Sequence, residues 1–177
     1  MPDQLTHEPA ARRPAWLVPA LTQAVIVLLV FAGAGALAGA VWEWLWTPPV
    51  GVVIDGEWLL GLAALRSEFS ATGLYVLVAS AAGLVTGALC GLLLDRAELV
   101  TLAAGLAGAA LAGWVMVQVG HALGPADPRQ LAQTAADRTR LPSDLRITGA
   151  SPYIAFPAGA TLGLAVLFLG LTKRHAD

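Results

Sequence analysis

The chain has 177 residues, which is enough for one domain or two very small ones. It is 57% apolar and only 12% charged, with a mean hydropathy of +0.71. Soluble globular chains carry about 25% charged residues, so this composition excludes an ordinary soluble enzyme. Ten basic residues against twelve acidic ones exclude a nucleic-acid binder. The single cysteine, Cys90, excludes an internal disulfide framework and a Cys/His zinc site. An integral membrane protein, with the lipid bilayer as its first partner, is the class that is left.

Four long stretches of the chain contain no Asp, Glu, Lys or Arg. They run from Pro14 to Trp42, Phe69 to Leu94, Leu99 to Ala126 and Ile147 to Thr172. About 20 helical residues cross the roughly 30 Å of a bilayer core, and helices satisfy their own backbone there. The sequence therefore predicts an all-α membrane protein with four transmembrane helices, at about 20–42, 73–94, 100–122 and 153–172. The alternative interpretation is a buried helical core in a soluble protein.

The first stretch has a competing interpretation as a cleavable signal peptide. Arg12 and Arg13 would be its basic region, and Ala36-Leu37-Ala38 resembles a small-residue cleavage site. The apolar run from Val18 to Trp42 is longer than such a region requires, however, and it ends in three tryptophans. We therefore expect a helix that stays in the membrane, with residues 1–15 as a cytoplasmic tail and residues 16–177 as the membrane domain.

Orientation follows from basic residues near the ends of the spans. The predicted inner segments and outer loops hold five basic residues each, so the count alone decides nothing. Those inside lie directly against their spans, and most aromatic side chains fall at the opposite interface. We expect both termini inside a bacterial plasma membrane. The inner set is Arg12, Arg13, Arg96, Lys173 and Arg174, and the outer set is Arg66, Arg129, Arg138, Arg140 and Arg146.

Two outer loops, at about 47–72 and 124–150, carry signals for local structure. Asp55-Gly56 between β-favouring residues predicts a hairpin. Asp127 as N-cap, with Pro128 following it and Gln130 in a capping-box position, predicts a short helix that runs to about Thr139. Residues 145–148 are expected to form an extended piece that pairs with the hairpin. Together these elements predict a small extracytoplasmic cap of a hairpin and a short helix, the alternative being two solvated loops.

Small residues recur at four-residue spacing on each predicted span. In lipid such stripes let helix backbones approach closely, so we expect them to pack the bundle. A stripe left exposed would instead serve a homo-oligomer or a contact with another membrane protein. The packing residues are Gly35, Gly39, Gly83, Gly87, Gly91, Gly105, Gly113, Gly159 and Gly163, with Ala109 in the third stripe.

Three polar side chains within or near the spans are candidates for function. Glu43 and His121 lie at similar predicted depth, where a pair would titrate or carry protons, and Gln118 lies one turn before His121. Glu43 also has a plainer interpretation as an interfacial carboxylate among tryptophans. No motif for nucleophilic, metal or phosphate chemistry is present in the sequence, so we assign no catalytic residue, no metal site and no cofactor.

The outer arginines provide a further candidate site. Arg129, Arg138, Arg140 and Arg146 are of the type that binds an anionic lipid headgroup or a cell-wall phosphate. Interleaved aspartates also explain them as a solvated surface.

The chain resembles a family of small actinobacterial four-helix membrane proteins of unknown function. The resemblance rests on the tryptophan-rich exit from the first span (Trp42 to Pro48), on the Gly120 to Pro125 sequence GHALGP, on Leu145-Arg146 before Gly149 and on Phe156-Pro157. It covers about residues 20–172, and the excess of arginine over lysine fits a GC-rich actinobacterial genome. The family implies no activity, substrate or catalytic residue, and Glu43 is not part of its pattern.

We therefore expect a non-enzymatic plasma-membrane protein, an accessory or structural partner of cell-envelope machinery. The first alternative is a small transporter or proton-coupled conduit, in which Glu43, Gln118 and His121 converge on a water-filled crevice. The second alternative is an envelope lipid-processing enzyme with an outer site around His121, Glu43 and the loop arginines.

Overall fold

The computed structural model describes residues 17–93 and 98–174, and gives side chains for 18–61, 70–92 and 102–167. The predicted tail 1–15, and Asp95 with Arg96 of the predicted inner turn, lie outside the described residues.

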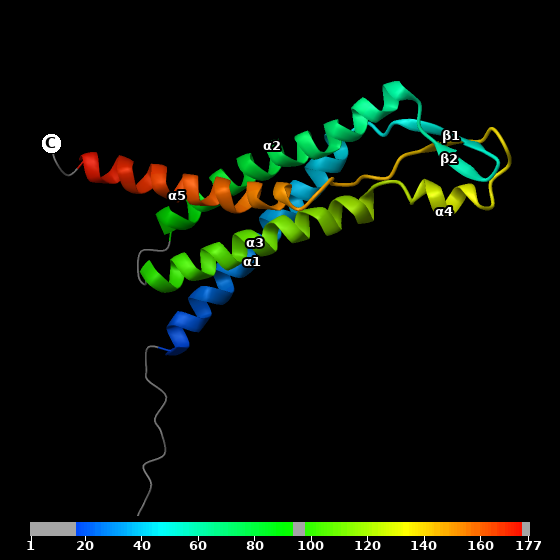
Figure 1. Ribbon diagram of the computed structural model, residues 1–177. Helices are drawn as coiled ribbons and strands as arrows, with labels where there is room; N and C mark the ends of the chain where they lie inside the picture. The colour runs from blue at the N-terminus through cyan, green and yellow to red at the C-terminus, as the bar shows by residue number, and fades with distance from the viewer. Residues whose placement is uncertain (1–16, 94–97, 175–177) are drawn as a thin grey trace, which may run out of the picture.

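Four long helices account for most of the described chain (Figure 1). They are α1 (Leu17–Leu45), α2 (Leu62–Leu93), α3 (Glu98–Leu123) and α5 (Ala155–Arg174). By length and composition three of them, α1, α2 and α3, are long and apolar enough to cross a membrane. The fourth predicted span corresponds to α5, where the apolar stretch described is shorter, Ser151–Leu167. α2 begins well before the predicted span at 73, so the first connecting loop is shorter than 47–72.

The helices pack as two close pairs, α1 against α3 and α2 against α5 (Figure 1). Glycine makes both pairs possible, because a Cβ at Gly35 would overlap the backbone of Ala112, and a Cβ at Gly87 would overlap that of Ala160. The α2–α5 pair is reciprocal, since Gly159 of α5 meets the backbone of α2 in the same way. Backbones in contact leave room for few large side chains, so alanine forms much of the interior.

Large aromatic side chains join the two pairs. Trp42 of α1 meets Tyr75 of α2 edge-on at 5.2 Å between ring centroids, and Phe31 of α1 meets Phe156 of α5 at 6.3 Å. Trp42 donates a hydrogen bond from Nε1 to the carbonyl of Ala71 at 2.9 Å. Trp42, which we expected at the membrane interface, is 0% exposed, so its side chain is buried among the helices. A side chain of that size at the end of the bundle fills the gap where the helices diverge.

The two loops at one end of the bundle form a single small sheet with strand order β2-β1-β3 (Figure 1). The strands are β1 (Val50–Ile54), β2 (Glu57–Leu59) and β3 (Arg140–Pro142). The predicted hairpin is confirmed: β1 and β2 pair antiparallel, and the turn residues Asp55 and Gly56 both have positive φ, as a two-residue turn of this kind requires. We call residues 46–61 and 124–149 the sheet module.

The prediction that residues 145–148 pair with the hairpin is wrong. β3 is the strand that pairs with β1, and Ser143 N–H extends the ladder to the carbonyl of Pro49 at 2.8 Å. Leu145 instead turns inward and is buried in the core. Beyond it, Thr148 N–H donates to Thr72 Oγ1 of α2 at 3.1 Å. The segment after the sheet therefore crosses the helix ends, where Leu145 and Ile147 pack into the hydrophobic core.

The short helix α4 (Pro128–Ala132) begins as predicted and ends early. Asp127 is its N-cap and accepts a hydrogen bond from Arg129 N–H at 3.0 Å. The predicted end at Thr139 is wrong, because Arg138 adopts a left-handed φ of 63° and its N–H donates to Val53 at 2.8 Å. A longer helix would withdraw these residues from the sheet.

Candidate functional site

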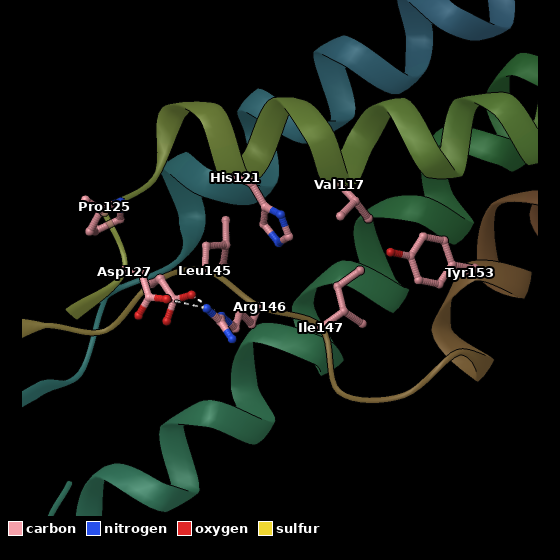
Figure 2. Close-up of a pocket in the computed structure, with 10 residues that line it drawn as sticks. Val117, His121, Pro125, Asp127, Leu145, Arg146, Ile147 and Tyr153 are labelled. Atoms are coloured by element: carbon pink, nitrogen blue, oxygen red, sulfur yellow. Dashed lines mark hydrogen bonds and ion pairs between the residues drawn. The ribbon is translucent and has the colours of Figure 1, made fainter. Parts of the chain in front are cut away.

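Two cavities lie at the junction between the bundle and the sheet module. The larger, about 420 Å³, is bounded by the end of α3, the residues after it and the segment 144–147. Figure 2 shows His121 and Val117 projecting from α3 toward that segment, with Tyr153 at the end of the cavity away from Asp127. The smaller cavity, about 350 Å³, lies between the end of α1, β2, the start of the buried part of α2 and the segment 143–149. Asp144, Arg146 and Ile147 line both, so they form the wall between the cavities.

An ion-pair network centred on Arg146 forms the polar part of that wall. Its Nη2 lies 2.9 Å from Asp127 Oδ2, and its Nε donates to Asp144 (Figure 2). Asp127 thereby connects α4, which it caps, to the segment after β3. The hydrogen bond that Arg146 donates to Asp144, helped by the negative charges of Asp144 and Asp127, raises the pKa of Arg146 above its usual value. Arg146 is thus a fixed cation that links the two halves of the second loop.

Aromatic side chains separate the larger cavity from the interior of the bundle. The ring of His121 lies 6.5 Å from that of Trp42, and Tyr75 lies 6.2 Å from Tyr153. The hydroxyl of Tyr75 is satisfied inside the bundle, where it donates to the carbonyl of Gly113 at 3.1 Å. Its proton is therefore held by the backbone of α3 and is not presented to the cavity.

The structure does not bring the three predicted polar residues together. His121 lines the larger cavity, but neither Glu43 nor Gln118 lines either of the two cavities. Among the described residues no hydrogen bond or ion pair joins Glu43 to His121. Gln118 is exposed, and the charged groups that act on His121 are Asp144 and Arg146. Of the three, only His121 therefore lines either of these two cavities.

The predicted packing glycines fall into three groups. A Cβ would overlap a facing backbone at six of them: Gly35, Gly39, Gly83, Gly87, Gly159 and Gly163. Gly91 faces leucine side chains, and Gly113 has only ordinary contacts with Tyr75 and Tyr153. A Cβ at Gly105 would meet no atom within 4 Å, so that glycine lies at no close contact.

Sequence reasoning missed several residues of the junction. Gly120 was not among the predicted packing residues, yet a Cβ there would come within 2.6 Å of the Trp42 ring. Its position seven residues after Gly113, two helical turns, was the available signal. Trp46 and Trp58 line the smaller cavity, and Asp144 joins Arg146. Trp46, Trp58 and Asp144 come from three separate segments, so no spacing in the sequence relates them.

The arrangement can bind polar groups, because guanidinium groups, carboxylates and an imidazole line the two cavities. Comparison of the chain with protein-family models, with curated proteins and with solved structures found no match.

Proposed function

We propose that this chain is a multi-pass protein of a bacterial plasma membrane, with four membrane-spanning helices and both termini inside. It acts without catalysis, as an accessory or structural partner of cell-envelope machinery, and presents the sheet module on the outer side. The resemblance to the actinobacterial four-helix family is consistent with this proposal and adds no activity to it.

The observation that carries the proposal is a belt of exposed apolar side chains on all four long helices. Soluble monomers rarely expose contiguous apolar patches larger than a few hundred Å². Here Leu29 and Leu37 of α1 and Leu77 of α2 are 66%, 72% and 69% exposed. The belt continues on α3 and α5 with Leu102, Leu106, Trp114, Leu162 and Val166. Hydrocarbon is the medium in which such a surface is stable.

The outer face of the sheet supports the second half of the proposal. Alternation along β1 puts Val50 and Ile54 on the same face, and the register places Leu59 of β2 opposite Val52 on that face. Val50, Ile54 and Leu59 are all exposed. An apolar sheet face outside the lipid-facing belt is suited to contact with another protein.

Membrane topology is the first test. In a Cys90→Ser background, single cysteines at Gly56 and at Ala97 are labelled in intact cells with a membrane-impermeant maleimide. We expect labelling at position 56 without lysis and at position 97 only after permeabilisation. Labelling of both positions from the same side would contradict the four-span threading.

A photo-crosslinking residue at Ile54 tests the partner. We expect it to capture an identified protein of envelope synthesis, while the same residue at Leu77 in the apolar belt captures none. Recovery of only a second copy of this chain would replace the accessory role with a homo-oligomer.

A further inference from the structure

The smaller cavity is lined by side chains that the proposed accessory role does not use. Trp46 directly follows α1, Trp58 comes from β2, Arg129 comes from α4, and Arg146 comes from the segment after β3. These residues are far apart in the sequence, and the sheet brings them together by pairing β1 with both β2 and β3. The cavity therefore exists only when the sheet module is folded against the helices.

Three charged residues line this cavity, the cations Arg129 and Arg146 and the anion Asp144. Asp144 is bound to Arg146, and Asp127, which does not line this cavity, binds Arg146 as well. Arg129, in contrast, forms no ion pair with any residue that the structure describes. The backbone of Arg129 is held by the Asp127 cap, and its guanidinium is exposed.

One of the residues that line this cavity also has a buried hydrogen-bond donor without a partner. Trp46 is only 8% exposed, and within the described chain its Nε1 is the buried side-chain nitrogen or oxygen atom that has no hydrogen-bond partner. The neighbouring indole of Trp58, by comparison, donates to the carbonyl of Leu141 at 3.1 Å. Leaving a buried donor unpaired carries a free-energy cost. An acceptor atom placed beside Trp46 would recover that loss.

The depth of the cavity matches the headgroup layer of a bilayer, and this step rests on the proposed membrane placement. Trp46 follows the predicted end of the first span, residue 42, by four residues, which is about 6 Å along a helix. Headgroups extend the roughly 30 Å core to about 40–45 Å, which is about 5–8 Å on each side. The indole of Trp46 thus lies where lipid phosphates lie.

We propose that the cavity lined by Trp46, Arg129 and Arg146 binds the phosphate group of a phosphate ester. A planar guanidinium donates two parallel hydrogen bonds to such an oxyanion. Arg129 supplies the charge, and Trp46 Nε1 supplies a neutral donor once a phosphate oxygen reaches it. Arg146 stays paired to its two carboxylates and fixes the wall. An anionic phospholipid and a soluble phosphate ester share this chemistry, and the experiment below separates them.

The test follows the indole N–H signals of the full-length chain by NMR after labelling of tryptophan with ¹⁵N. Trp46→Phe assigns the Trp46 signal by its disappearance. The probes are inorganic phosphate added to protein in a neutral detergent, and nanodiscs of phosphatidylcholine with or without phosphatidylglycerol. We expect the Trp46 signal to shift with phosphate, with phosphatidylglycerol, or with both. A response to phosphatidylglycerol alone identifies a lipid headgroup, and a response to inorganic phosphate identifies a free phosphate group.

Arg129→Gln provides the second readout, with Arg140→Gln as the matched control. Arg140 is also an exposed arginine of the sheet module, but it does not line the cavity. Loss of a charge-assisted contact weakens binding about tenfold in Arg129→Gln, while Arg140→Gln binds as the unaltered chain does. The proposal is overturned if neither probe shifts Trp46, or if both variants weaken binding equally. Phosphate binding in detergent does not require a bilayer, so this measurement remains informative even if the topology experiment contradicts the four-span threading. Failure of the phosphate site is therefore distinguishable from failure of the proposed membrane placement.

Discussion

The helical bundle and the sheet module are stabilised in different ways. In the bundle, α2 and α5 bring backbone against backbone at Gly83, Gly87 and Gly159, and the outward side chains are apolar. In the sheet module, strands exchange backbone hydrogen bonds, and the ion pairs of Arg146 bridge the loop. In lipid, close packing is a main source of attraction between helices. In a module surrounded by water, buried polar groups are paired by hydrogen bonds. Each region therefore uses the interaction that its proposed surroundings make effective.

The largest expected effect comes from a substitution that adds a methyl group inside the α2–α5 contact. In Gly87→Ala the Cβ would overlap the carbonyl of Ala160, and the helices must separate. In Gly105→Ala the Cβ would meet no atom within 4 Å. Alanine favours the helix equally in both variants, so the difference between them measures packing. We expect Gly87→Ala to be less stable than Gly105→Ala by about 3 kcal/mol, measured by reversible unfolding in mixed detergent micelles. Equal stabilities would show that close approach does not hold the bundle.

The second prediction concerns Trp42, which lies where the two regions meet. Trp42→Phe removes the 2.9 Å hydrogen bond to the buried carbonyl of Ala71 and part of the ring that fills the end of the bundle. We expect a loss of about 2 kcal/mol in the same unfolding measurement.

Trp44→Phe is the matched control for this prediction. Trp44 is 79% exposed, and surface substitutions usually change stability by less than about 0.5 kcal/mol. If Trp44→Phe proved the more damaging of the two, the buried junction around Trp42 would not be what joins the helix pairs.

Local rules predicted the parts of the fold in which neighbouring residues decide the outcome. Asp55-Gly56 specifies a two-residue turn by its own backbone preferences, and Asp127-Pro128 specifies the start of a helix. Charge-free length likewise predicted the long helices, because burial of ions is costly over any 20-residue span. These features need no knowledge of distant residues.

Contacts between distant residues defeated the same reasoning. The end of α4 is set by the backbone hydrogen bonds that Val53 makes with Arg138 and Thr139, which lie far along the chain from it. Trp42 ends the predicted first span, where an interfacial anchor is expected. Its side chain is nevertheless buried, because Gly120 on another helix leaves space for the ring. At the junction, Arg146 was predicted only as one of several outer arginines, because its partner Asp127 lies in a separate element. Polar residues in irregular loops carry no period from which their partners can be inferred.

The smallest predicted effect belongs to the ion-pair network of the sheet module. Arg146 is 55% exposed, and Asp127 is 25% exposed, so water screens much of their attraction. In a double-mutant cycle of Arg146→Met with Asp127→Asn, we expect a coupling energy of about 0.5–1 kcal/mol at low salt. It should fall toward zero near 1 M salt, where the Debye length is about 3 Å. Addition of the same salt should leave the Gly87→Ala and Gly105→Ala difference unchanged, because no charge contributes to it. A coupling energy that persists at high salt would mean that Arg146 stabilises the sheet module through the packing of its side chain. The bundle and the sheet module would then both depend on packing.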